Sequence, residues 1–198
     1  MVFTSLARLT PDDEDDASDL YVFDIYSGRT TLESPPAGWV QRYRPQLYPR
    51  ISGDGRFIVF QAVDEQGPAW WQTLVLDRRD GSVRVLSVSR TGDLANGHCT
   101  QAAISADGST VVFESLATNL AGADTNGQVA DICAVRLDDR DVTRVSVARD
   151  GSQPKDGHPL GGFGIRKSSC VTWRRASPRV SRCRPRARSR MARVRGRH

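Results

Sequence analysis

The residues best suited to chemistry in this chain lie in one short loop. Asp124, Asn126 and Gly127, followed by Asp131, supply carboxylate and amide oxygens around a tight turn. Calcium prefers oxygen ligands of this kind, although the full spacing and bidentate Glu of an EF-hand are missing. In a purely structural interpretation, Asn126-Gly127 makes a turn and Asp131 caps a strand. We predict no metal site or cofactor, and leave open whether this loop binds calcium. A similar acidic run comprises Asp12, Glu14 and Asp19.

No other pattern is typical of an active site. The sequence contains no Gly-x-Ser-x-Gly elbow and no His-x-x-x-His pair, and its glycines form no phosphate-binding loop. His98 and His158 occupy matching positions after a glycine, which a repeat explains, and His198 is the last residue. We therefore predict no catalytic residues and a protein that is not an enzyme.

The cysteines form no Cys-x-x-Cys pair and fit no zinc motif. We expect Cys133 to be a small buried strand residue. Two others fall in a basic region near the C-terminus, where we expect them to be exposed. They leave the redox compartment, and with it the localisation, undetermined. The four residues are Cys99, Cys133, Cys170 and Cys183.

Aromatic side chains interleaved with arginines offer a candidate recognition surface. Such residues also pack between sheets, where they bury large areas. Because neighbouring strand residues point to opposite faces, we expect Trp71 to pack and Trp70 and Trp39 to be exposed. The aromatic set is Trp39, Trp70, Trp71 and the Tyr43–Tyr48 region, and the arginines are Arg42, Arg44 and Arg50.

Charge divides the chain into two regions. Residues 1–158 carry all 23 acidic and 15 basic residues, a net charge of −8, whereas residues 159–198 carry 13 basic residues and no acid. The overall charge of +5 therefore describes neither region. No stretch reaches the roughly 18 apolar residues of a membrane span, and the first residues do not have the pattern of a secretory signal.

An internal repeat marks the acidic region. Ile51-Ser-Gly-Asp-Gly55 recurs as Ile104-Ser-Ala-Asp-Gly108, and Val2-Phe3-Thr-Ser-Leu-Ala7 recurs as Val112-Phe-Glu-Ser-Leu-Ala117. These offsets give a unit slightly longer than the ~40–50 residues of common propeller repeats. We predict four short strands in the clearest copy, each rich in β-branched residues and bounded by Gly, Asp or Asn. They are Gln101–Ser105, Thr110–Glu114, Asp131–Arg136 and Val142–Val147.

These motifs resemble the TolB-type β-propeller repeat. Ala117-Thr-Asn-Leu120 and Asp124-Thr-Asn-Gly127 add to the resemblance, which covers roughly residues 2–157. It implies an all-β fold, a partial β-propeller of four-stranded antiparallel blades at about 1–34, 45–90 and 98–149. It also implies a scaffold for protein or small-ligand contacts, from a family that is often periplasmic or secreted. The middle copy departs from the pattern at Asp64-Glu-Gln-Gly67 and Ala69-Trp-Trp71.

The repeat disappears in residues 158–198. The next Ile-Ser-x-Asp-Gly is due near residues 163–168, where the chain reads Phe-Gly-Ile-Arg-Lys-Ser. A shift of reading frame in a GC-rich gene accounts for the Arg-rich tail, which lacks the apolar residues needed to order itself. The alternative is a basic arm, residues 166–197, that binds nucleic acid through phosphates.

We therefore expect a non-enzymatic scaffold, truncated or frameshifted, of about two and a half blades. A propeller needs at least about four blades, so open blade edges favour self-association. The partner is an unidentified protein or small ligand. The alternatives are nucleic-acid binding through the tail and an accessory propeller of a peptidase.

Overall fold

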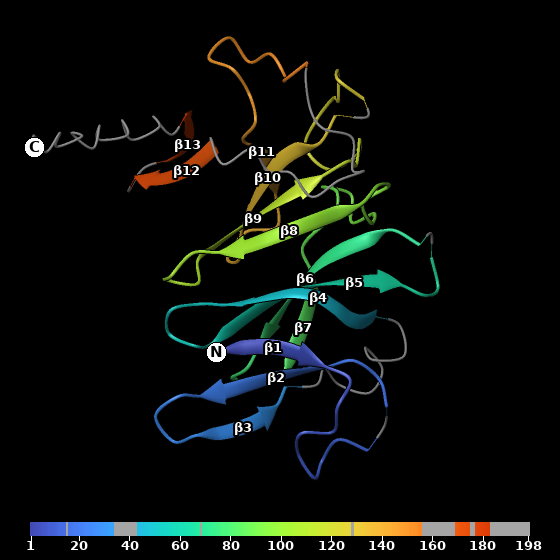
Figure 1. Ribbon diagram of the computed structural model, residues 1–198. Coiled ribbons are helices and arrows are strands. Elements are labelled where there is room, and N and C mark those ends of the chain that lie inside the picture. The colour runs from blue at the N-terminus through green and yellow to red at the C-terminus, as the bar shows by residue number, and fades with distance from the viewer. Residues whose placement is uncertain are drawn as a thin grey trace, which may run out of the picture. The chain divides into compact units, whose positions relative to one another are not determined.

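The computed structural model describes residues 1–14, 16–33, 43–67, 69–127, 129–155, 169–174 and 177–182. It divides the chain into two compact units, Met1–Gly161 and Gly162–His198. In the first unit, Figure 1 follows three sheets along the chain, from blue through cyan to green and yellow. Each sheet contains three or four strands in sequence order, and we name them blades 1, 2 and 3.

Every strand pairs antiparallel with its neighbour in the chain. Blade 1 has the order β1-β2-β3, blade 2 the order β4-β5-β6-β7 and blade 3 the order β8-β9-β10-β11. The strands are β1 (Val2–Ser5), β2 (Asp19–Asp24), β3 (Arg29–Leu32), β4 (Tyr43–Ile51), β5 (Phe57–Asp64), β6 (Trp71–Asp77), β7 (Ser82–Val85), β8 (Cys99–Ile104), β9 (Thr110–Ser115), β10 (Asp131–Arg136) and β11 (Val142–Arg144).

The predicted all-β fold of four-stranded antiparallel blades is confirmed in blades 2 and 3. All four strands predicted for blade 3 are present, and Asp131–Arg136 has the predicted bounds. The outer strand is shorter than predicted and ends at Arg144. Its ladder stops there because the Ile132 N–H bonds the Ser146 hydroxyl, at 3.1 Å, instead of a backbone carbonyl.

The repeated Ile-Ser-x-Asp-Gly motif is a turn that satisfies its own polar groups. In blade 2 the Ser52 hydroxyl donates to Asp54 at 2.5 Å and accepts from the Phe57 N–H at 3.0 Å. Ser105, Asp107 and Thr110 repeat this arrangement in blade 3. The glycine follows with a positive φ, 74° at Gly55 and 69° at Gly108, which side chains disfavour. The motif therefore forms the turn of a β-hairpin.

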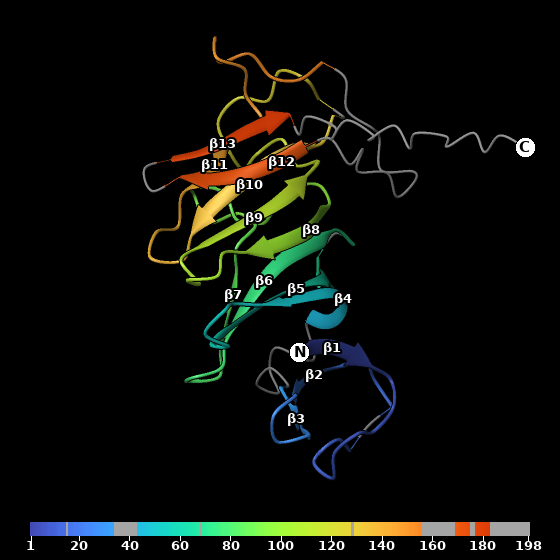
Figure 2. The same cartoon turned by 60° about the vertical axis from the view of Figure 1, so that its left-hand side comes forward.

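The core lies between the blades. One buried cluster joins Leu20 and Val22 of blade 1 to Ile58, Phe60 and Leu74 of blade 2. The other joins the opposite face of blade 2 to blade 3, with members that include Val59, Val75, Val111, Phe113 and Cys133. Figure 2 shows the same succession of sheets from a second direction. Blade 2 is thus covered on both faces.

The second unit contains two strands that the sequence did not predict. β12 (Ser169–Arg174) pairs antiparallel with β13 (Ser177–Arg182). The remainder of the Arg-rich tail lies outside the described residues. Among the described residues, no helix has the length and apolar character needed to cross a membrane.

Candidate functional site

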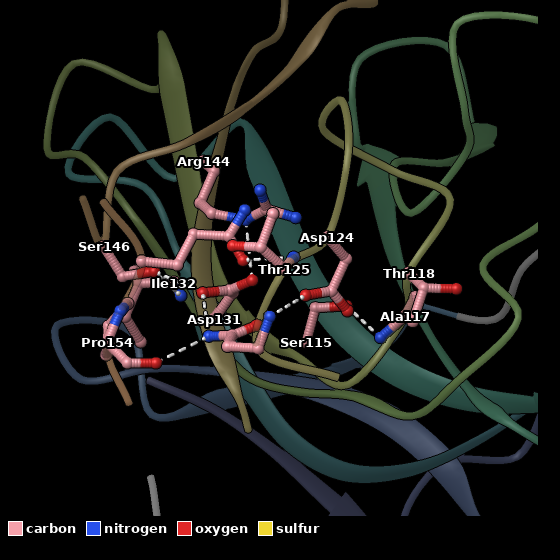
Figure 3. A network of polar contacts seen from close by, with 12 residues as sticks. Ser115, Ala117, Thr118, Asp124, Thr125, Asp131, Ile132, Arg144, Ser146 and Pro154 are labelled. Carbon is pink, nitrogen blue, oxygen red and sulfur yellow. Dashed lines mark hydrogen bonds and ion pairs between the residues drawn. The ribbon is translucent and has the colours of Figure 1, made fainter. Parts of the chain in front are cut away.

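The predicted loop of blade 3 forms a buried polar network (Figure 3). The Asp131 carboxylate lies 2.6 Å from Nε of Arg144, and the two side chains are only 4% and 7% exposed. The Ser146 hydroxyl donates to Asp131 at 2.8 Å and accepts from the Ile132 N–H. This network joins the start of β10 to the chain that follows β11. We call the Asp131–Ser146 pair the blade latch of blade 3.

The carboxylates of the predicted calcium loop have other partners in this structure, whereas the buried Oδ1 of Asn126 accepts no hydrogen bond. Asp124 accepts hydrogen bonds from the N–H groups of Asn126 and Gly127 at 3.0 and 3.1 Å, and Gly127 has a φ of 63°. The Arg144 guanidinium supplies the positive charge beside Asp131. In the described part of the chain, no three His, Cys, Asp or Glu side chains are grouped to hold a metal ion. The loop contains the predicted turn before β10, and calcium binding by it stays an open prediction.

Blade 2 has the same latch with different residues. Ser87 donates to the Gln72 side chain at 2.6 Å and accepts from the Thr73 N–H at 3.1 Å. Gln72 also donates to the Ala95 carbonyl, while in blade 3 Asn126 donates to the Pro154 carbonyl. Both latches join residues fifteen apart. Asp19 and Ser34 have this spacing in blade 1, but Ser34 lies outside the described residues.

His98 and the two described cysteines of the first unit have structural roles. Nδ1 of His98 accepts a hydrogen bond from the Trp71 N–H at 3.2 Å, and burial lowers the pKa of His98. Cys99 and Cys133 are both buried free thiols, and desolvation raises the pKa of each to about 12. Cys133 lies in β10, as the sequence predicted. His158, His198 and Cys183 lie outside the described residues, and Cys170 lies in β12.

The predicted aromatic set is only partly described. Trp70 is 36% exposed and packs edge-on against His98 with ring centroids 4.8 Å apart. Trp71 is half-buried at the start of β6. Tyr48 and Arg50 are exposed in β4, which also contains Tyr43 and Arg44, whereas Trp39 and Arg42 lie outside the described residues.

Two matching bulges interrupt the first strands of blades 2 and 3. Tyr48 and Gln101 have φ angles of 52° and 53°, and each lies at a register shift of its strand. With its amide oxygen turned toward blade 3, the buried Gln61 of blade 2 accepts hydrogen bonds from the N–H groups of Gln101 and Ala102, the latter at 3.2 Å. A bulge is therefore held by the preceding blade.

Among the described residues of the first unit, no further blade packs on the face of blade 3 that is equivalent to the covered face of blade 2. Val59, Gln61 and Thr73 are 0–1% exposed beneath blade 3. In blade 3, the strand register places Val112, Glu114 and Ile132 at the equivalent positions. All three side chains are half-buried. Desolvation raises the pKa of Glu114. This partly apolar surface, which we call the open face, comprises Val112, Glu114 and Ile132.

The sequence interpretation missed the open face, Gln61 and both latch serines. The fifteen-residue spacing of Gln72–Ser87 and Asp131–Ser146 is a signal that could have identified the latches. Nucleic-acid binding through residues 166–197 and a peptidase accessory role stay predictions.

No family model and no curated protein matches the chain. It is similar to the solved structure of TolB from Acinetobacter baumannii, with 16% identity over 76% of this chain and 32% of that chain, and a TM-score of 0.46. The tricorn protease gives 15% identity over 67% and 11%, with a TM-score of 0.44. Putative TolB from Agrobacterium tumefaciens gives 24% over 66% and 42%, with a TM-score of 0.43. The chain thus spans less than half of each structure, two of which are of TolB, whose repeat its motifs resemble.

Proposed function

We propose that this chain is a non-enzymatic repeat scaffold that binds protein through the uncovered faces of its end blades. The observation that carries the proposal is the contrast between equivalent residues of two blades. Val59, Gln61 and Thr73 are buried by the next blade, whereas Val112, Glu114 and Ile132 are only half-buried. A surface of this shape and composition fits another β-sheet of the same repeat.

We propose that the chain is not an enzyme because its described candidate nucleophiles are buried as thiols or hydrogen-bonded within the fold. Cys99 and Cys133 are buried, and their raised pKa values favour the thiol rather than the reactive thiolate. The Ser87 and Ser146 hydroxyls are held in the blade latches. His98 contacts Trp70 and the Trp71 backbone.

The occupant that we propose for the open face is a second copy of this chain. Phe3 and Phe23 of blade 1 match Phe113 and Val135, which in blade 3 pack toward the preceding blade. Both phenylalanines are half-buried, while Tyr21 between them is covered by hydrogen-bonded contacts with Ala7 and Asp13. Both faces are therefore partly apolar, and we propose that copies associate head to tail through them.

Sedimentation velocity over a range of concentrations tests this proposal. We expect the chain to self-associate and Ile132→Lys to abolish association, because a charge would be buried in the contact. Ile25→Lys is the matched control, since Ile25 is 66% exposed in the β2–β3 turn. A chain that stays monomeric at high concentration, or an Ile132→Lys variant that associates like the wild type, contradicts the proposal.

The interpretation as a fragment of a longer propeller is part of the same proposal. After blade 2, the chain turns with hydrogen bonds from Ser89 N to Asp93 O and from Gly92 N to Ser89 O, and it continues into β8. After blade 3, Ala148, Ser152 and Gly151 repeat these two bonds. This conformation supports a fourth blade in the parent protein. Translating the gene's other two frames past codon 158 tests it: an Ile-Ser-x-Asp-Gly motif is expected, and its absence from both counts against a frameshift.

A further inference from the structure

A cleft between blades 2 and 3 combines one unneutralised cation with apolar walls. Its volume is about 360 Å³, and it lies away from the open face. Arg84 is half-buried in it and donates to the Leu137 carbonyl at 2.9 Å. Among the described residues no carboxylate pairs with Arg84. Its lining residues are Arg56, Phe57, Val75, Asp77, Ser82, Val83, Arg84 and Leu137.

The other arginine of the cleft is already neutralised. Arg56 contacts both oxygens of Asp77, with Nη2 at 2.6 Å from Oδ2, and its guanidinium lies 4.5 Å from the centre of the Phe57 ring. Asp77 is thereby committed to Arg56, and its pKa is lowered chiefly by that bond. The free positive charge in the cleft therefore belongs to Arg84.

The interface between blades 1 and 2 contains an arginine that a carboxylate of the chain neutralises. There Arg78 lies 2.6 Å from the Glu33 carboxylate and donates to the Gly55 carbonyl at 2.8 Å. By backbone hydrogen bonding, Leu86 and Leu137 take the positions of Glu33 and Arg78 at the next interface. The interface between blades 2 and 3 therefore has leucines where the preceding interface has an ion pair.

Arg84 is also a departure from the repeat. Its register partner is Val75, and the equivalent residues are Thr31 opposite Val22 in blade 1 and Thr143 opposite Ala134 in blade 3. Two blades fold with threonine here, so the blade itself does not require a cation. A half-buried guanidinium without a counter-charge is costly, and burial, with Arg140 nearby, lowers the pKa of Arg84.

We propose that this cleft binds a small carboxylic acid with an apolar body. The carboxylate bonds the N–H groups of Arg84 that the Leu137 carbonyl leaves free. The apolar part of the ligand lies against Phe57 and Val75. The volume is within the lower range of small-molecule sites.

Titration with benzoate, followed by the backbone amide NMR signals of Val83 and Leu137, tests the proposal. We expect saturable shifts with benzoate and none with benzamide, which has the same shape without the charge. Arg84→Met should weaken binding roughly tenfold or more through the loss of charge-assisted hydrogen bonds. Arg84→Thr, which copies the other blades, should do the same while keeping the wild-type fold. Arg79→Met is the control, because Arg79 is an exposed arginine outside the cleft.

Two further ligands test whether the cleft binds free acids or the C-terminal carboxylate of a peptide chain. A hexapeptide ending in phenylalanine is tested with a free and with an amidated C-terminus, and inorganic phosphate is tested alone. Benzoate binding without peptide binding assigns the cleft to free acids, and binding of only the free-ended peptide besides benzoate assigns it to chain ends. Equal binding of benzamide, binding of phosphate alone, or benzoate binding unchanged in both Arg84 variants would overturn the proposal.

Discussion

Blade 2 closes its latch with the uncharged Gln72, whereas blade 3 uses Asp131 with a guanidinium beside it. Gln72 accepts from Ser87 and donates to the Ala95 carbonyl with one side chain. A carboxylate has no N–H to donate. In blade 3 Asn126 therefore makes the bond to the following chain, and Arg144 neutralises the acid. Both blades are thus joined at the same backbone positions, whereas the side chains that join them differ in charge.

The largest expected effect comes from breaking the charged latch. Asp131→Ala leaves Arg144 buried without its partner and should lower the free energy of unfolding by about 3–5 kcal/mol, measured by urea denaturation. The double variant Asp131→Gln, Arg144→Val copies blade 2 and should recover most of that loss. Asp138→Ala, which removes an exposed pair with Arg136, is the control and should change nothing measurable. A small loss in Asp131→Ala would mean that the two latches are not equivalent.

Substitution of the turn glycines tests how tightly each of the two interfaces between blades is packed. A Cβ on Gly108 would lie 2.8 Å from Phe57 Cδ2, whereas one on Gly55 would meet only Arg78 Nη1 at 3.8 Å. Both glycines have positive φ angles. Gly55→Ala should therefore cost about 1 kcal/mol for the backbone alone, and Gly108→Ala about 2–4 kcal/mol because overpacking is added. Equal melting temperatures for the two variants would show that Phe57 moves aside freely.

We expect a smaller difference in stability between truncations on the covered face of blade 2 and on the open face of blade 3. Val59→Ala removes two methyl groups from a fully buried site and should cost about 2 kcal/mol in chemical denaturation. Val112→Ala removes the same atoms from a half-buried site and should cost less than half as much when the chain is monomeric. If the two losses are equal at low protein concentration, the face of blade 3 is covered in solution.

Glu114 gives the smallest effect, and it depends on pH. Burial raises its pKa above the ordinary value of 4.5, so folding favours the neutral acid. Its contribution to stability is therefore present below that value and is lost as the pH rises through the raised pKa. Glu114→Gln, which copies Gln61, should be slightly more stable than the wild type near pH 7 and lose that advantage near pH 4. Parallel stability curves across this range would contradict the predicted shift.

The sequence predicted the parts of this fold that local chemistry determines. The Ser-x-Asp-Gly turns are visible because Ser52, Asp54 and Gly55 satisfy one another within a few residues. The strands follow from β-branched residues between such turns. The Asp131 loop was recognised as polar and tight, yet its role depended on Arg144, thirteen residues away, whose pairing no local pattern specifies.

The candidate sites could not be predicted in the same way. In the described part of the first unit, no blade covers Val112 and Ile132 as blade 3 covers Val59 and Thr73, and this is a property of the stack rather than of a strand. The cleft at Arg84 depends on Leu137 from the next blade. The sequence instead emphasised Trp70 and Trp71, which were notable by residue type.

The blade latches also bear on the order in which the chain folds. Each joins residues only fifteen apart, and the paired strands of a blade are close in sequence. Contacts of low sequence separation carry a small loop-closure entropy and form early. A blade can therefore close soon after its outer strand leaves the ribosome, before the next blade has been synthesised. Assembly would then proceed as successive docking of closed blades, and blade 3 would dock with its bulge against Gln61 of blade 2, which is already in place.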